Sequence, residues 1–147
     1  MIPFYALVVS FLLFKALGLL GMNHFEGWQT PLQGAVAVML LLAASAHWGK
    51  RRPDLIRMVP PAFPRPDLIV SVTGLLEIAG AVAILLPATS QAASIGLTVL
   101  LVAMFPANVR AAKENMTIGG RPVPKLFIRS VLQLIFIAAI LLAGFCP

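Results

Sequence analysis

A single carboxylic acid, Glu77, stands in the middle of a long apolar stretch, where an ionisable side chain is costly and usually functional. With a helical rise of about 1.5 Å per residue, its carboxyl group would lie roughly 14 Å from either end of the stretch. Thr73 and Gly74 one turn before it, and Gly80 and Ala81 one turn after it, form a narrow face of small and polar residues. Such a face lets another helix approach closely, so we expect Glu77 to meet a partner there or to stay protonated.

Other polar side chains fall near the ends or the middle of neighbouring apolar stretches. Arg129 and Gln133 are four residues apart and therefore share a helix face. Together these side chains predict one polar pocket that opens toward the cytoplasm, lined by His47, Thr73, Glu77, Asn108, Arg129 and Gln133. Two interpretations stay open, namely hydrogen bonds that fix the helices to one another and a site for a small ligand, a quinone or a proton.

Catalytic and metal-binding motifs are not found in the sequence. It contains no Gly-rich phosphate loop, no nucleophile elbow and no H-E-x-x-H motif, so no catalytic residue is predicted. The one cysteine, Cys146, excludes an internal disulfide and dithiol chemistry within the chain. His24 and His47 are expected on opposite sides of the membrane and cannot share a metal ion, so no metal site is predicted.

The elements that must hold these residues are apolar helices. Hydrophobic residues make up 60% of the 147 residues and charged residues only 11%, against about 45–50% and about 25% in soluble domains. The apolar stretches are each close to the ~20 residues that cross a hydrocarbon core of about 30 Å, and cover roughly 2–20, 31–48, 68–86, 92–109 and 126–145. They predict an all-α transmembrane bundle of five spans that forms one domain over residues 1–147.

Basic residues predict the orientation of this bundle. The formal net charge is +6, and ten of the eleven Lys and Arg residues lie in or beside the second and fourth breaks between the apolar stretches. The positive-inside rule places both breaks in the cytoplasm, with the N-terminus cytoplasmic and the C-terminus outside a cell inner (plasma) membrane. No nucleic-acid-binding module is recognisable, so nucleic acid is not an expected partner. Lys15 is the exception, and it either snorkels toward the outer interface or pairs with another helix.

Prolines, glycines and tryptophans mark the ends of the elements. The segment from Pro53 to Pro66 is expected to be too proline-rich for a regular helix. Pro106 should bend the helix that contains it, and Gly119-Gly120 predicts a turn. Trp28 and Trp48 flank the second span, as residues that anchor a helix at both membrane interfaces do.

Several short motifs follow one another from the second span onward, at residues 45–48 (Ser-Ala-His-Trp), 58–61, 73–80, 85–87, 104–108 and 129–133. In combination they resemble the DoxX-like integral membrane protein family over roughly residues 32–145. The resemblance implies a four-helix core at 31–145, to which residues 1–22 add an N-terminal span. The family takes its name from a subunit linked to thiosulfate:quinone oxidoreduction, which makes a quinone a candidate cofactor, although the missing cysteine pair argues against direct sulfur chemistry.

Three functions are compatible with the sequence. The first is an accessory membrane protein that binds a small ligand or a partner at the Glu77 face, and that also meets the lipid bilayer and a partner subunit or a second copy of the chain. The second is a quinone-linked membrane oxidoreductase subunit. The third is a proton-coupled transporter of small molecules, for which five short spans are few unless the protein oligomerises.

Overall fold

Helices account for almost all of the regular structure. The computed structural model describes residues 1–146 and is 73% helical, with six helices. These are α1 (Ile2–Leu19), α2 (Gln29–Ser45), α3 (Arg52–Met58), α4 (Pro66–Ala83), α5 (Ser90–Lys113) and α6 (Leu126–Phe145). A 3₁₀ turn, η1 (Asn23–Phe25), precedes α2, and two short strands, β1 (Thr117–Ile118) and β2 (Arg121–Pro122), precede α6. The predicted all-helical class is confirmed.

Four helices in the described part of the chain, α1, α4, α5 and α6, are long and apolar enough to cross a membrane. Helix α2 is apolar but has only 17 residues, and it ends at Ser45 rather than at the expected Trp48. The structure thus confirms a bundle of several apolar helices compatible with a membrane protein, but it does not confirm the count of five spans.

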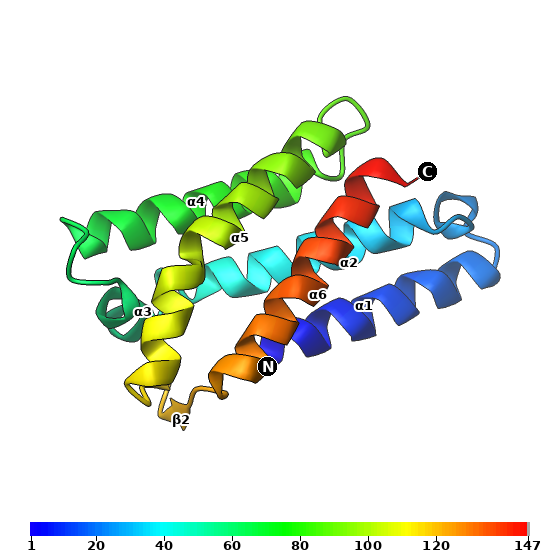
Figure 1. Cartoon of the computed structure of the whole chain (residues 1–147). Helices are drawn as coiled ribbons and strands as arrows, with labels where there is room; N and C mark the ends of the chain where they lie inside the picture. The colour runs from blue at the N-terminus through cyan, green and yellow to red at the C-terminus, as the bar shows by residue number, and fades with distance from the viewer. Residues whose placement is uncertain (147) are drawn as a thin grey trace.

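The central helix of the bundle is α2, which packs against α1, α4 and α6. Its small side chains Ala35, Ala37 and Ala44 are at most 4% exposed, which lets the neighbouring backbones come close. Helices α5 and α6 pack against each other beside it (Figure 1). The buried core therefore surrounds α2, while the other helices present large apolar side chains outward.

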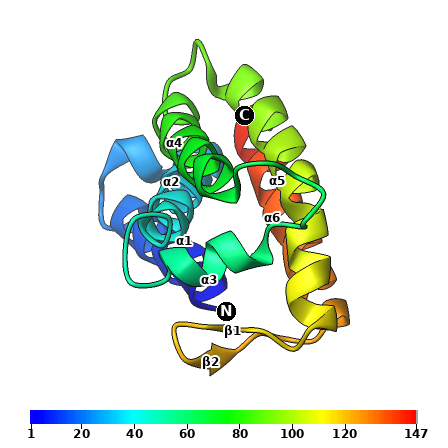
Figure 2. The same ribbon diagram turned by 90° about the vertical axis from the view of Figure 1, so that its left-hand side faces the viewer.

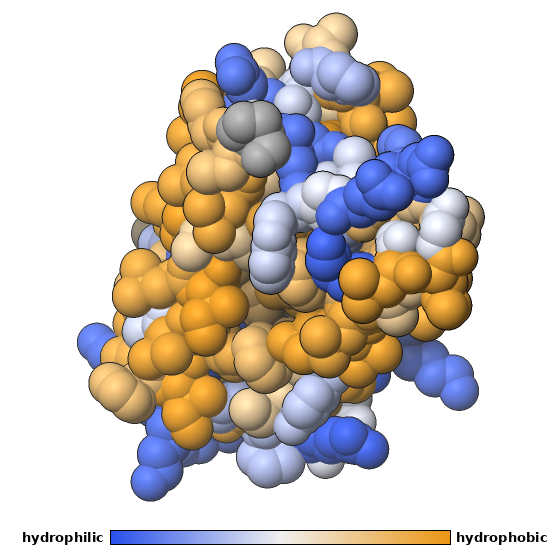
Figure 3. All heavy atoms as spheres, turned by 90° about the vertical axis from the view of Figure 1, so that its right-hand side faces the viewer, coloured by the Kyte–Doolittle hydropathy of each residue, from blue (hydrophilic) through white to orange (hydrophobic). Residues whose placement is uncertain are grey.

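Large apolar side chains cover the outside of the bundle. Val9 and Val99 are each 63% exposed and Leu134 is 67% exposed. Figure 3 shows hydrophobic side chains over much of one face, around a smaller hydrophilic patch. Water would make such a surface costly, whereas lipid tails solvate it.

The connections gather at two opposite ends of the bundle. The N-terminus, α3 and the β1–β2 hairpin lie at one end, and η1, the α4–α5 connection and the end of α6 lie at the other (Figures 1 and 2). The two connections that hold most of the basic residues thus share an end, as alternation across a membrane requires.

Helix α3 corrects one sequence expectation. The segment from Pro53 to Pro66 was expected to contain no regular helix, yet Arg52–Met58 is helical. Pro53 lies at the start of this helix, where a backbone N–H has no helical partner to lose, so proline is tolerated. The expectation holds for residues 59–65, which are not helical, and Pro66 begins α4 in the same way.

The turn predicted at Gly119-Gly120 closes the small hairpin. Strands β1 and β2 are antiparallel, with Thr117 opposite Pro122, and the two glycines have φ of 60° and 76°. Positive φ at both central residues is typical of a type I′ turn, for which glycine has no steric cost. The strands themselves were not predicted from the sequence, because each has only two residues.

Lys15 lies near the end of α1, and its ammonium group reaches the loop before α2. Nζ donates to the carbonyl oxygens of Glu26 (2.9 Å) and Gly27 (3.2 Å). It also lies 5.1 Å from the centre of the Trp28 ring, a cation–π distance. Of the two interpretations of Lys15, these contacts favour the one in which the side chain extends toward the nearer end of the bundle.

Candidate functional site

Three of the predicted site residues meet between the end of α2 and the middle of α4. His47 and Glu77 are buried, at 5% and 4% exposure, and His47 Nε2 lies 3.5 Å from Glu77 Oε2. His47 Nδ1 lies 2.6 Å from the carbonyl oxygen of Val70 and 3.4 Å from Thr73 Oγ1. The acid that the sequence singled out therefore faces a histidine from another element.

A glycine makes this contact sterically feasible. A Cβ atom at Gly74 would lie 2.8 Å from both Cβ and Cγ of His47 and 2.8 Å from a ring carbon of Trp48. The turn after α2 thus folds over α4 at the one residue without a side chain. The small face predicted around Glu77 is used here by a turn and its two aromatic side chains.

The hydrogen bonds of His47 define where its protons lie. A carbonyl oxygen only accepts hydrogen bonds, so His47 Nδ1 carries the hydrogen directed at Val70. Nε2 of a neutral ring would then present a lone pair to Glu77 Oε2, which would be another acceptor if the acid were ionised. Two facing acceptors in a buried site are unfavourable. The pair therefore requires one further proton, either on the carboxyl group or on Nε2.

Arg52, in the first turn of α3, holds the turn that carries His47. Its guanidinium donates to the carbonyl oxygen of His47 (2.7 Å), to that of Asp67 (3.1 Å) and to Ser71 Oγ (2.9 Å). These three acceptors lie on the turn and on the first two turns of α4. Arg52 therefore fixes the turn against α4 and positions His47 over Gly74.

The other three predicted residues meet between α5 and α6. Asn108 Nδ2 donates to Gln133 Oε1 (3.1 Å), and Gln133 Nε2 donates to the carbonyl oxygen of Leu101 (2.8 Å). Arg129 donates to Asn108 Oδ1. Gln133 is 8% exposed, so the amides form a buried chain of hydrogen bonds that ties the two helices together.

Hydrogen bonds and ion pairs thus join the six predicted residues in two groups of three, and within residues 1–146 none of them links one group to the other. Each group also contains a buried polar atom without a hydrogen-bond partner in this part of the chain, namely Glu77 Oε2 and Arg129 Nε. Such atoms are rare in proteins and mark places where a ligand, a water molecule or a proton completes the bonding.

Sequence reasoning missed the residues that position His47. Arg52 was assigned only to the basic connection, and Ser71 was not singled out. A signal was present, because Arg52 precedes Pro53 and Ser71 lies on the same helix face as Gly74. The pairing of Arg52 with carbonyl oxygens across the turn depends on chain geometry that the pattern does not encode.

Comparison with known proteins gives one match. A family model described as "Domain of unknown function (DUF8561)" matches residues 36–143, which extend from within α2 to within α6 and include both groups of polar residues. No curated protein matches the chain, and no solved structure matches it. None of this tests the resemblance to the DoxX-like family, which stays a prediction.

Proposed function

Since this chain belongs to the DUF8561 family, whose function is unknown, we propose its role from its own residues. We propose that it is a non-enzymatic integral membrane protein that binds a small ligand at the Glu77 face. The ligand is an apolar molecule with a hydrogen-bonding group, such as a quinone, which is also the cofactor that the resemblance to DoxX-like proteins implies.

The proposal includes five membrane spans, with α2 as the short fifth span. Its 17 residues cover about 25 Å, a little less than the hydrocarbon core of about 30 Å. Trp28 and Trp48 at its two ends extend the apolar length into the interfaces. With the basic connections in the cytoplasm, the N-terminus is cytoplasmic and the end of α6 faces outside.

The observation that carries the ligand proposal is the buried, unpartnered oxygen of Glu77. Oε2 has no hydrogen-bond partner within residues 1–146, and its nearest base, His47 Nε2, is 3.5 Å away. A carboxyl group at this depth is costly unless something binds to it. A ligand carbonyl or hydroxyl group between Glu77 and His47 would supply the missing bond, once the turn that carries His47 moves from Gly74.

The test is the substitution Glu77→Gln, which keeps the shape of the side chain and removes its dissociable proton. Native mass spectrometry of protein extracted in a mild detergent would measure the occupancy of small ligands in the wild type and in the variant. We expect the variant to keep its thermal stability to within about 1 kcal/mol and to lose most of the bound ligand.

The matched control is Ser94→Ala, since Ser94 is fully buried in α5 and its hydroxyl group bonds within its own helix. This change should leave the ligand bound. Equal ligand occupancy and equal stability in wild type and E77Q would exclude Glu77 as a binding group.

A second candidate function, proton-coupled transport of small molecules, is favoured by the single extra proton that the His47–Glu77 contact requires. A site that takes up one proton from one side and releases it to the other is the minimum for such coupling. Substrate flux in proteoliposomes driven by a pH gradient, and abolished by Glu77→Ala, would support this function. Ligand binding without any gradient-driven flux would leave the binding role in place and exclude the transport role.

A further inference from the structure

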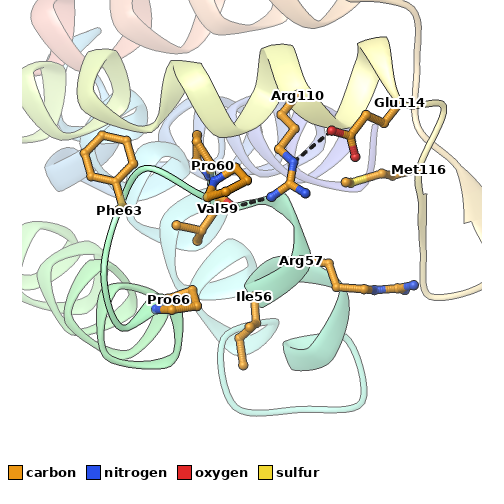
Figure 4. A pocket seen from close by; sticks show the side chains of 10 residues that line it. Ile56, Arg57, Val59, Pro60, Phe63, Pro66, Arg110, Glu114 and Met116 are labelled. Carbon is orange, nitrogen blue, oxygen red and sulfur yellow. Dashed lines mark hydrogen bonds and ion pairs between the residues drawn. The ribbon is translucent and has the colours of Figure 1, made fainter.

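A cavity of about 540 Å³ opens at the basic end of the bundle, away from the Glu77 face (Figure 4). It lies where α3, the proline-rich connection and the last turns of α5 meet. Its volume falls within the range of about 300–1,000 Å³ that is usual for small-molecule sites. Nothing in the proposed function uses it.

The walls of the cavity divide into an apolar side and a charged side. Figure 4 shows Pro60, Phe63 and Pro66 together on one side, and Arg110, Glu114 and Arg57 toward the other. Phe63 is 50% exposed. A ligand that matches both sides must itself have an apolar part next to a charged part.

The two guanidinium groups keep donors for such a ligand. Arg110 uses its Nε for Glu114 Oε1 (3.0 Å) and one N–H of Nη1 for the carbonyl oxygen of Val59. Arg57 pairs with Asp54 through Nη2 alone, and its side chain is 65% exposed. A guanidinium has five N–H donors, so within residues 1–146 three remain on Arg110 and four on Arg57. Their planar fork geometry suits phosphate oxygens.

The depth of the cavity places it at the headgroup layer of the membrane. Helix α5 has 24 residues, or about 36 Å, which exceeds a hydrocarbon core of about 30 Å. The last turn of α5, from Arg110 to Lys113, therefore extends beyond the acyl chains at the end of the bundle that carries the basic connections. Phosphodiester groups of the lipids lie at this level.

We propose that this cavity binds the phosphodiester headgroup of a membrane phospholipid. The phosphate lies against Arg110 and Arg57, and the glycerol and first acyl carbons lie against Phe63, Pro60 and Pro66. The bound lipid fills the space between the proline-rich connection and α5. This site is independent of Glu77 and of any ligand bound there.

The test measures phosphatidylglycerol binding to delipidated protein in detergent by native mass spectrometry. We expect Arg110→Gln and Arg57→Gln each to weaken binding about tenfold, because each removes a charge-assisted contact to phosphate. Arg121→Gln is the matched control, since Arg121 is an exposed cation in β2 at the same end and does not line the cavity. An equal loss in R121Q would reveal attraction by the overall positive charge and overturn the proposal.

Arg57 and Phe63 distinguish a bound lipid from a loosened connection and from a site for free phosphate. Arg110 also holds Val59, so R110Q both loosens the connection and removes a charge, whereas the exposed Arg57 makes no such contact. Wild-type binding by R57Q would therefore overturn the proposal. Phe63→Ser should weaken binding of the lipid without changing thermal stability. Inorganic phosphate should not displace the lipid at equal concentration, and displacement would show a site for free phosphate instead.

Discussion

At the scale of single residues, Gly74 is where the turn after α2 comes closest to α4. The ring of His47 lies over it and brings Nε2 to 3.5 Å from the Glu77 carboxyl group. The hydrogen bond from Nδ1 to Val70 orients that ring. The buried acid and its partner thus depend on the absence of one side chain.

Gly74→Ala should destabilise the protein by about 1–3 kcal/mol, because the new methyl group would overlap His47 and Trp48 at 2.8 Å. Thermal unfolding in detergent, followed by circular dichroism, measures the change. We also expect this variant to lose any ligand whose binding requires the His47–Glu77 pair.

Gly96→Ala is the control, since a Cβ atom at Gly96 has no neighbour within 4 Å. Alanine is the better helix former by roughly 0.5–1 kcal/mol, so this variant should be as stable as the wild type or slightly more so. Equal losses of stability in G74A and G96A would contradict the close packing over Gly74.

The sequence predicted which residues are buried and polar better than how they are grouped. Glu77 and Gln133 are buried as expected from their depth, because hydropathy defines depth in a helix. His47 was placed on the second span, but α2 ends at Ser45 and His47 lies in the turn beyond it. A helix wheel cannot describe a residue outside the helix, so the contact between His47 and Val70 was not predictable.

At the scale of elements, α3 and the β1–β2 hairpin are joined by one acid. Asp54 Oδ2 accepts a hydrogen bond from the backbone N–H of Gly119 at 2.9 Å, and Arg57 pairs with the same carboxylate. These bonds lower the pKa of Asp54 below its ordinary value of 3.8, the Gly119 bond being the larger cause. The hairpin is therefore attached to α3 by a bond that requires an ionised acid.

The attachment should weaken in acid. Because the pKa of Asp54 in the folded protein lies below its unfolded value, its stabilising effect is complete above about pH 3.8 and is lost as the pH falls through the lowered folded pKa. Hydrogen exchange measures this as a falling protection factor of the Gly119 amide. Asp54→Ala should show the low protection at every pH, whereas Asp67→Ala should behave as the wild type does.

The elements themselves follow from the sequence to different degrees. The apolar stretches predicted the long helices, because a chain in lipid must satisfy its backbone hydrogen bonds internally. Helix α3 was missed because prolines were counted as helix breakers, although Pro53 occupies the first turn, where it is harmless. Helix α5 runs through Pro106 and extends to Lys113, four residues past the expected end, because a charged last turn is stable outside the hydrocarbon.

At the scale of the whole molecule, the helices alternate in direction, so that the basic connections share one end (Figures 1 and 2). This agrees with the charge pattern, which was read without any knowledge of packing. The number of spans was harder to predict, because α2 has few residues and is shielded from lipid by the helices around it.

The proposed orientation can be tested with the one native cysteine. Cys146 is exposed at the end of α6, so a membrane-impermeant maleimide should label it in intact cells. In the double variant Cys146→Ser with Ala62→Cys, the only thiol lies in the exposed proline-rich connection at the opposite end. It should react only after the cells are permeabilised, and the reverse labelling pattern would contradict the orientation.

The concentration of ten of the eleven Lys and Arg residues in and beside the α2–α4 and α5–α6 connections restricts how copies of this chain could assemble. Inverting the protein would carry these cations through the hydrocarbon at about 2.5–3.5 kcal/mol each, so every copy in a membrane must point the same way. Any homo-oligomer is then parallel, with its rotation axis along the membrane normal. Its cationic ends would be crowded side by side, and anionic lipid or a negatively charged protein between them would hold the subunits together.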